Sequence, residues 1–364
     1  MKTEQFGDLQ PLFGRESSNL PLVIAGPCSA ETKETVMETA RRLNAEGVTL
    51  FRAGLWKPRT RPGAFEGVGS RGLGWLKAVK AETGMKVLTE AGNAAHAAMA
   101  VRAGLDGIWL GARTVANPFA VQEIADELKR LNATDITVLA KNPVNPDLEL
   151  WIGALERLLR AGIRRLGAVH RGFSSYLSGR WRNPPQWAIP IELHHRLPDL
   201  PLLHDPSHCS GKAAEVPDLA RKAMKLGFSG LMIESHIRPC DALSDAAQQI
   251  TPEEVGQLLR SLPAPKAEGA DDHTLQSLRE RIDTLDSELL QVLAKRMEAC
   301  REIGLYKQQE DMPVVQPDRY ASLLGDKIAE GGQLGLDPAF LRRLFSEIHA
   351  ASVDLQLNLS QETK

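Results

Sequence analysis

Side chains able to bind a metal ion follow three of the apolar runs in the first two thirds of the 364-residue chain. Gly26-Pro27-Cys28-Ser29 follows the first run, His204-Asp205-Pro206-Ser207-His208 ends the seventh, and Glu234-Ser235-His236 ends the eighth, with Asp245 soon after. A thiolate, an imidazole and two carboxylates form a mixed soft and hard ligand set that suits Mn, Fe, Co or Zn. Each residue alone has a structural explanation, because a lone cysteine is often a small buried residue and a carboxylate often pairs with arginine. Together they predict a site for one divalent metal ion.

Basic side chains follow other apolar runs of the same region and predict a site for anions. One exposed arginine at the end of a strand is usually a surface ion pair that contributes little. Six basic residues around one rim would repel one another unless an anion lay among them, and proteins hold phosphate and carboxylate groups with arginine and lysine. The pattern indicates a phosphorylated and carboxylated substrate, as one molecule or two. The six residues are Arg52, Lys57, Arg59, Arg113, Lys141 and Arg171.

Eight apolar or β-branched runs, separated by segments of helical periodicity, would position these side chains. Such alternation favours a parallel sheet, and eight units favour an α/β fold of the (β/α)8 TIM-barrel type over an open doubly wound sheet. In a barrel the functional residues lie at the C-terminal ends of the strands, which is where both groups of side chains occur. The expected strands contain residues 22–25, 49–51, 86–88, 107–110, 137–139, 166–169, 202–203 and 231–233.

A composition typical of a linker separates two parts of the chain. Residues 263–272 hold two prolines, a glycine and small polar residues. The strand signals stop beyond them, so we expect residues 1–262 to form the barrel and residues 273–364 to form a small all-helical domain. Apolar residues three or four positions apart predict a first long helix, and Asp337-Pro338 predicts the start of the last one. The seam of the first helix consists of Leu278, Ile282, Leu285, Leu289 and Val292.

The overall charge argues against two classes of partner. With 44 Lys+Arg against 46 Asp+Glu, no global positive field favours nucleic acid or an anionic membrane, so small-molecule substrates are expected instead. No apolar run reaches the roughly 18 residues that a membrane helix needs, and the polar start is not a signal peptide, so we expect a cytoplasmic protein.

The Gly67–Gly72 segment matches a dinucleotide-binding pattern but lacks the preceding strand, so we expect a substrate loop there.

Seven short motifs in the barrel region occur in the order of a known family. They are Gly26-Pro27-Cys28-Ser29, Lys57-Pro58-Arg59-Thr60, Gly111-Ala112-Arg113, Lys141-Asn142, His170-Arg171-Gly172, Asp205-Pro206-Ser207-His208 and Ile233-Glu234-Ser235-His236. Over about residues 15 to 262 the chain resembles the type I 3-deoxy-D-arabino-heptulosonate 7-phosphate (DAHP) synthase family. The resemblance implies condensation of phosphoenolpyruvate with D-erythrose 4-phosphate in the shikimate pathway.

The same resemblance implies roles for individual residues. Lys57 is the candidate proton donor, with a metal-bound water as the alternative. A related synthase that uses arabinose 5-phosphate shares the barrel, but Lys57-Pro58-Arg59-Thr60 favours the four-carbon sugar. The implied metal ligands are Cys28, His208, Glu234 and Asp245; the phosphoenolpyruvate-binding residues are Arg52, Lys57, Arg113, Lys141 and Arg171; and Arg59 with Thr60 would bind the phosphate end of erythrose 4-phosphate.

Polar residues interrupt the apolar faces of the helical part. Arg296 continues the seam of the first helix, where an unpaired buried charge is costly, so we expect it to meet an anion, unless the side chain reaches outward to solvent. Ser352 and Gln356 lie on the apolar stripe of the last helix. Arg279, Lys307 and Arg319 complete a cationic set suited to a dicarboxylate.

These residues resemble those of the all-helical chorismate mutase family over about residues 273 to 356. The resemblance implies a homodimer in which Arg279 of the partner subunit and Arg296 hold the carboxylates of chorismate. Lys307 and Gln356 would bond the ether oxygen, and Arg319 and Ser352 match further binding positions. Tyr320 and Gln316 replace acidic residues of relatives, so the alternative is a non-catalytic dimerisation and regulatory module. In either case we expect the helical domain to transmit feedback inhibition by prephenate or chorismate.

Overall fold

The computed structural model describes residues 6–14, 21–57, 63–175, 179–262, 273–315 and 317–362, without the side chains of residues 273–277, 317–319, 321 and 360–362. The chain divides into two compact units, Met1–Lys266 and Ala267–Lys364. The expected linker at residues 263–272 lies outside the described residues.

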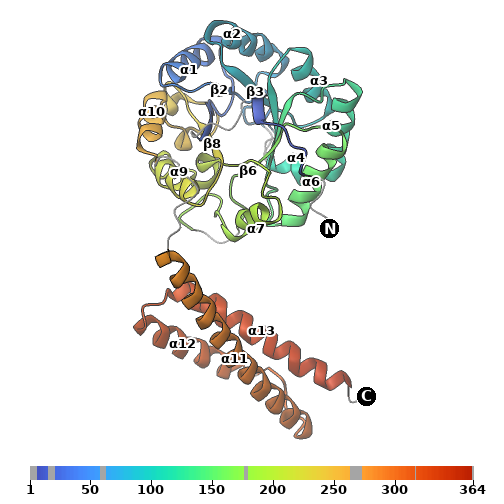
Figure 1. The fold of residues 1–364 in the computed structure, drawn as a ribbon, viewed down its shortest axis with the longest axis vertical. Helices are drawn as coiled ribbons and strands as arrows, with labels where there is room; N and C mark the ends of the chain where they lie inside the picture. The colour runs from blue at the N-terminus through green and yellow to red at the C-terminus, as the bar shows by residue number, and fades with distance from the viewer. Residues whose placement is uncertain are drawn as a thin grey trace. The chain divides into compact units, whose positions relative to one another are not determined.

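The first unit is a closed barrel of eight parallel strands in sequence order, β1 to β8 (Figure 1). The predicted (β/α)8 fold is therefore confirmed, and each expected strand contributes to a strand of the barrel. Strand β1 closes the barrel by pairing with β8, which places Gly26 opposite Glu234. The strands are β1 (Leu22–Gly26), β2 (Leu50–Arg52), β3 (Lys86–Glu90), β4 (Gly107–Leu110), β5 (Thr137–Lys141), β6 (Leu166–His170), β7 (Leu202–His204) and β8 (Gly230–Glu234).

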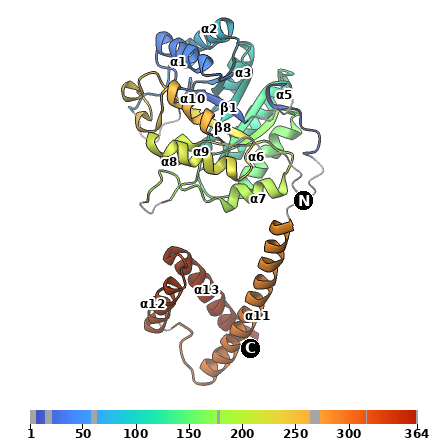
Figure 2. The same cartoon turned by 60° about the vertical axis from the view of Figure 1, so that its left-hand side comes forward.

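Helices surround the barrel (Figures 1 and 2). Helix α6 shows why they form: Asp147 accepts a hydrogen bond from the Leu150 amide at its start, and Trp151, Leu155 and Leu158 form its buried face. The helices are α1 (Lys33–Ala45), α2 (Leu73–Thr83), α3 (Ala94–Arg102), α4 (Ala112–Val115), α5 (Pro118–Arg130), α6 (Leu148–Arg160), α7 (Ala188–Arg196), α8 (Pro206–Ser210), α9 (Val216–Lys225) and α10 (Pro252–Ser261). Short 3-10 turns are η2 (Leu12–Gly14), η3 (Gly69–Gly72), η4 (Ala213–Glu215), η5 (Pro239–Asp241) and η6 (Ala246–Gln248).

Two apolar clusters hold the barrel together. The larger one lies between the strands and the surrounding helices. The smaller one fills the interior of the barrel, where Leu12 and Phe13 of η2 join one side chain from each of the eight strands. Its strand residues are Ile24, Leu50, Leu88, Trp109, Leu139, Val169, Leu203 and Met232.

The second unit consists of three helices, α11 (His273–Gln309), α12 (Pro317–Gln333) and α13 (Pro338–Glu362). Helix α13 begins where predicted, because Asp337 accepts a hydrogen bond from the Phe340 amide at 2.7 Å. The five seam residues of α11 are at least half exposed, with exposed fractions of 52% for Leu285 and 61% for Val292. In the described part of the chain, no helix combines the length and the apolar character needed to cross a bilayer.

Candidate active sites

Charged side chains form a layer above the apolar interior, at the C-terminal ends of the strands. Side chains two positions apart on a strand point to the same face, so each residue that follows the apolar layer by two also points inward. The physical reason for the convergence of the predicted residues is therefore the period of the strands. The layer consists of Arg52, Glu90, Lys141, Arg171, Asp205 and Glu234.

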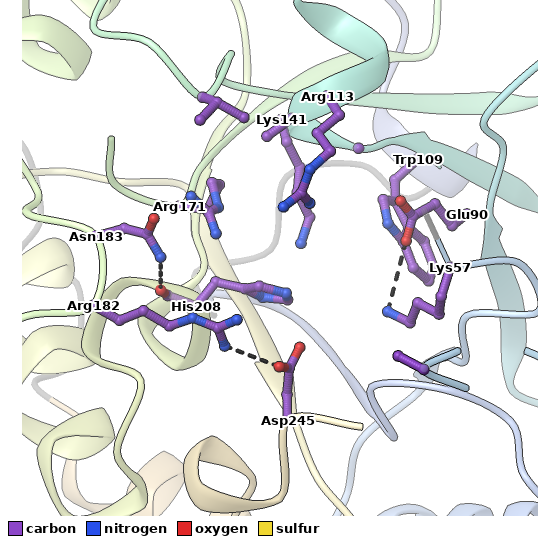
Figure 3. A pocket seen from close by; sticks show the side chains of 14 residues that line it. Lys57, Glu90, Trp109, Arg113, Lys141, Arg171, Arg182, Asn183, His208 and Asp245 are labelled. Carbon is purple, nitrogen blue, oxygen red and sulfur yellow. Dashed lines mark hydrogen bonds and ion pairs between the residues drawn. The ribbon is translucent and has the colours of Figure 1, made fainter. Parts of the chain in front are cut away.

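A cavity of about 290 Å³ opens above this layer (Figure 3). Five basic side chains and two acidic ones line it, which leaves a net positive environment for anions. Arg113, Lys141 and Arg171 extend into the same space in Figure 3. The charged lining residues are Lys57, Arg113, Lys141, Arg171 and Arg182 against Glu90 and Asp245, with His208 beside them.

The predicted metal ligands come together at one side of the cavity. Ligand atoms of Cys28, Glu234 and Asp245 all lie within 4.8 Å of one another. The pairing of β1 with β8 places Cys28 beside Glu234, and Sγ of Cys28 donates a hydrogen bond to Oδ2 of Asp245 at 3.3 Å. His208, in α8, borders the cluster, with Nε2 3.6 Å from Oε1 of Glu234. This mixed donor set fits a divalent transition metal.

The electrostatics of the cluster depend on burial. Burial and the nearby Glu234 carboxylate raise the pKa of the Cys28 thiol to about 12. Burial also acts to raise the pKa of Asp245, but His208 and Arg182 outweigh it and hold that pKa below its ordinary range. The thiol is therefore the proton donor to an ionised carboxylate. A cation at this point would favour the thiolate instead, because a metal ligand must be deprotonated.

Asp205 connects the metal cluster to the basic side chains. Its Oδ2 accepts a hydrogen bond from Lys141 Nζ at 2.7 Å and lies 2.8 Å from Nδ1 of His208. Burial opposes ionisation, but His208 and Lys141 hold the pKa of Asp205 well below its usual value. Because the carboxylate only accepts, Nδ1 of His208 carries the proton and Nε2 presents its lone pair toward the cluster.

Arg52 belongs to the charged layer and is fully buried, and its side chain does not line the cavity. One of its terminal nitrogens donates to Glu234 at 3.1 Å and to the Cys28 carbonyl at 3.3 Å, and the guanidinium lies 4.6 Å from the centre of the Trp109 ring. Among the described residues, its Nε and its other terminal nitrogen have no hydrogen-bond partner. Unpaired buried donors are costly, so these two nitrogens are candidates for contact with an anion.

The lack of side chains at Gly54 and Gly111 leaves room for Lys57 and Glu90 beside the metal cluster. A Cβ at Gly54 would meet Cε of Lys57 at 2.7 Å, and a Cβ at Gly111 would meet Oε1 of Glu90 at 2.4 Å. The two side chains are thereby placed so that Lys57 Nζ lies 3.7 Å from Oε2 of Glu90. Burial alone would lower the pKa of Lys57, but its interactions with Cys28 and with the carboxylates of Glu90 and Glu234 raise it above its ordinary value.

The helical unit joins α11 and α13 through polar side chains. Arg296 donates a hydrogen bond to Oγ of Ser352 at 2.7 Å, so its side chain meets a polar group rather than reaching outward alone. Lys307 donates to the Val314 carbonyl at 2.6 Å. Burial, Arg296 and Lys307 lower the pKa of His349, which places this imidazole near both cations.

Other predicted residues of this unit differ in their surroundings. Gln356 is buried on α13, four residues after Ser352. Arg279 is exposed on α11. The side chain of Arg319 and the whole of Gln316 lie outside the described residues. Tyr320 stacks on His349 with ring centres 4.1 Å apart, and its hydroxyl bonds Ser346.

The barrel matches known proteins over its whole length. A family model described as the DAHP synthetase I family matches residues 13–264. The phospho-2-dehydro-3-deoxyheptonate aldolase of Thermotoga maritima is 34% identical over 244 residues, which are 66% of this chain and 68% of that relative. The chain belongs to the DAHP synthetase I family. A crystal structure of a DAHP synthase from Thermotoga maritima covers 67% of this chain and 68% of its own, with a TM-score of 0.60 and 30% identity.

The helical unit of this DAHP synthase matches a second family. The chorismate mutase type II model covers residues 278–357. A 4-amino-4-deoxychorismate mutase of Streptomyces pristinaespiralis is 38% identical over 87 residues, which are 23% of this chain and 67% of that relative. The chain is therefore a bifunctional shikimate-pathway enzyme, with a DAHP synthase followed by a chorismate mutase.

The DAHP synthase barrel brings most of the predicted site residues together. Two of the carboxylates also form ion pairs with basic side chains, as the alternative to metal binding predicted for a carboxylate beside arginine. Glu234 pairs with Arg52, and Asp205 pairs with Lys141. Arg59 and Thr60 lie outside the described residues, so their expected role stays a prediction. The segment Gly69–Gly72 forms η3, with no strand directly before it.

Sequence reasoning did not select several residues of the site. Glu90 ends β3 two positions after the inward-facing Leu88, a signal that could have identified it. Arg182 and Asn183 lie in the loop between β6 and α7, where no periodic pattern marks them. There Asn183 donates to the His208 carbonyl at 2.7 Å and Arg182 pairs with Asp245 (Figure 3).

Proposed function

We propose that the barrel condenses phosphoenolpyruvate with D-erythrose 4-phosphate to give DAHP and phosphate, using one divalent ion that is Mn, Fe, Co or Zn. We also propose that the helical unit rearranges chorismate to prephenate. The observation that carries the first part is the buried guanidinium of Arg52, with hydrogen-bond donors that have no partner among the described residues.

An anion with two acidic groups supplies what Arg52 lacks. Leaving buried donors unpaired costs about 1–3 kcal/mol or more for a charged group, and a phosphate or carboxylate would satisfy them with charge-assisted bonds. Arg113, Lys141 and Arg171 line the cavity above the charged layer to which Arg52 belongs. Phosphoenolpyruvate carries a phosphate and a carboxylate, so it can engage several of these cations at once.

The metal ligands and Lys57 would both act on the aldehyde group of the sugar. An ion held by Cys28, His208, Glu234 and Asp245 supplies a Lewis acid for the aldehyde oxygen. C3 of phosphoenolpyruvate bonds to the aldehyde carbon, and Nζ of Lys57 donates the proton that the aldehyde oxygen takes up. Water adds at C2 and phosphate leaves, so that one water is consumed for each DAHP. The raised pKa keeps the Lys57 ammonium charged at neutral pH, so it can also stabilise negative charge that develops on the aldehyde oxygen.

The helical unit would act by positioning chorismate and by stabilising the charge that develops during the reaction. Arg296, oriented by Ser352, is suited to bind a carboxylate of chorismate. Lys307 and Gln356 would stabilise the charge that develops on the breaking C–O bond, and no cofactor is needed. Arg319 would add a further binding group. The neighbouring His349 has a lowered pKa and is neutral at pH 7, so it does not compete for the carboxylates.

A homodimer through α11 would complete the mutase site. The exposed seam from Leu278 to Val292 is apolar over several turns, and a partner copy would remove it from water. In such a dimer Arg279 of the partner would join Arg296. Replacing Leu285 by arginine should convert the dimer to a monomer in a size measurement and abolish chorismate turnover; a dimer that persists would contradict this arrangement.

Feedback inhibition is the second proposed task of the helical unit. Prephenate or chorismate bound at Arg296 would lower the rate of the barrel reaction in the full chain. Prephenate should inhibit DAHP formation by the parent and not by the Arg296→Ala variant. Equal inhibition of both proteins would show that the sensor lies elsewhere.

Two assays test the catalytic assignment directly. Phosphoenolpyruvate consumption should be rapid with erythrose 4-phosphate, slow with arabinose 5-phosphate, and lost after removal of metal by a chelator. A preference for the five-carbon sugar would assign the barrel to the related synthase. Loss of chorismate absorbance tests the mutase, and its absence would favour the purely regulatory module.

A further inference from the structure

Two consecutive glutamines, Gln248 and Gln249, contact the proposed metal ligands from the loop after β8. Both side chains are 1% exposed, and both amides use their oxygen and their nitrogen in hydrogen bonds to other segments. We infer that this pair, together with Arg182, preassembles the metal site by fixing Cys28, Glu234 and Asp245 in place. The inference rests on the proposed metal cofactor.

Gln248 links two carboxylates. Its Nε2 donates to Oε2 of Glu234 at 2.7 Å, and its Oε1 accepts from Arg182 at 2.7 Å. The same terminal nitrogen of Arg182 donates to Oδ1 of Asp245 at 2.9 Å. A guanidinium only donates and a carboxylate only accepts, so the amide has one orientation that satisfies both ends. Oδ2 of Asp245 is left facing Cys28.

Gln249 holds the cysteine. Its Oε1 accepts the hydrogen bond of the Cys28 backbone amide at 3.1 Å, and its Nε2 donates to the Ser244 carbonyl at 2.9 Å. The hydroxyls of Ser244 and Ser29 are also hydrogen bonded. Gln249 therefore fixes Cys28, two residues beyond β1, relative to Ser244, which precedes Asp245.

The backbone of this loop is constrained in a way that needs such support. Asp245 has a φ of 50°, in the left-handed region that few non-glycine residues adopt. The loop returns to β8, where the Ile250 amide donates to the Glu234 carbonyl at 3.1 Å. The two glutamines thus lie between the strained residue and a fixed strand.

Outer hydrogen bonds to metal ligands typically account for 10- to 100-fold in metal affinity. We expect Gln248→Met and Gln249→Met, which keep the side-chain length, to weaken Mn²⁺ binding to the full chain by that factor in calorimetry. The thiolate-to-Co²⁺ absorption band should also weaken at equal Co²⁺, most in Gln249→Met. Thermal unfolding without metal should change little by comparison.

Helix α5 offers a matched control. Gln122 accepts from Arg157 at 3.0 Å and donates to Asp126 at 2.8 Å, so it has the same two kinds of partner away from the cluster. Gln122→Met should leave Mn²⁺ affinity within twofold. Arg182→Met combined with Gln248→Met should weaken binding by less than the product of the single effects, because the two residues form one chain of hydrogen bonds.

The outcomes separate the two proposals. If the parent chain binds Mn²⁺ and both glutamine variants bind it with the same affinity, the positioning role alone is overturned. A parent chain that binds neither Mn²⁺ nor Co²⁺ would overturn the cofactor and the positioning role together. If Gln248→Met does not fold, Arg182→Lys, at a half-exposed side chain, tests the same connection. An affinity within twofold of the parent there would contradict it.

Discussion

The ammonium of Lys141 lies 2.7 Å from Oδ2 of Asp205, and both side chains are buried in the layer above the apolar interior of the barrel. The same oxygen lies 2.8 Å from Nδ1 of His208. One carboxylate therefore neutralises a cation of the anion-binding cavity and orients a proposed metal ligand. Burial lowers the pKa of Lys141 despite this pairing, which makes the lysine dependent on its partner.

Replacing Asp205 by asparagine should impair both functions. An amide cannot accept from Lys141 and His208 at the same oxygen with the strength of a carboxylate, and its NH₂ end would face a donor. We expect 10- to 100-fold weaker Mn²⁺ binding and a similar fall in kcat/KM for phosphoenolpyruvate. Asp218→Asn, at an exposed ion pair with Arg221, is the control. Unchanged metal affinity in Asp205→Asn would remove Asp205 from the ligand support.

Arg52→Lys tests whether the buried guanidinium meets the substrate. Lysine keeps the charge but loses the planar set of donors. We expect KM for phosphoenolpyruvate to rise at least tenfold, or about 1.4 kcal/mol, while KM for the sugar changes less. Removing the charge in Arg52→Met should destabilise the barrel by about 3–5 kcal/mol, because Glu234 would stay buried without its arginine. Equal effects on both KM values would argue for a purely structural Arg52.

His204 should make the barrel sensitive to acid. Burial lowers its pKa to about 4, and its Nδ1 lies 3.0 Å from Nδ1 of His170. Nε2 of His170 faces the Pro185 carbonyl and therefore carries the proton of this imidazole. Nδ1 of His170 is then an acceptor, so Nδ1 of His204 donates to it. The unfolded chain takes up a proton near pH 6.5 and the folded one only near pH 4. Stability is therefore full above pH 6.5 and falls as the pH drops toward 4.

The difference in the pKa of His204 should lower the free energy of unfolding by about 3 kcal/mol between pH 6.5 and pH 4. Urea unfolding at pH 7 and pH 4.5 measures most of it, and tryptophan fluorescence reports the barrel alone because all six tryptophans precede residue 263. His204→Asn should lose less stability on acidification than the parent. His194→Asn, at an exposed position, should behave like the parent. An identical acid response in His204→Asn would exclude His204 as the cause.

Arg296→Ala should lower kcat/KM for chorismate by about 10²–10³, the range seen when a charge-stabilising donor is removed. Ser352→Ala should cost less, because Ser352 only orients the guanidinium. DAHP formation without prephenate should be unchanged in both variants. Arg301→Ala, at an exposed position on the same helix, provides the control. Mutase activity that survives in Arg296→Ala would contradict the site.

The sequence by itself determined the order of the strands, the helical second unit and the residue types at each strand end. It could do so because these signals are local: side chains alternate along a strand, and polar residues two positions beyond an apolar one identify its C-terminal end. Their positions at the ends of predicted strands were sufficient to place Arg52, Lys141 and Glu234 at one rim of the barrel.

Only the tertiary structure decided how loop residues complete the site. The resemblance selected Asp245 and not Asp205 as a metal ligand, and the fold places Asp205 between Lys141 and His208, and Asp245 beside Cys28. Gln248 and Gln249 carry no periodic signal, because their role depends on a loop that returns to β8. Such contacts join segments far apart in the chain, so neither spacing nor composition encodes them locally. The seam of α11 shows the same limit, because it is exposed in the single chain and only the proposed partner copy would bury it.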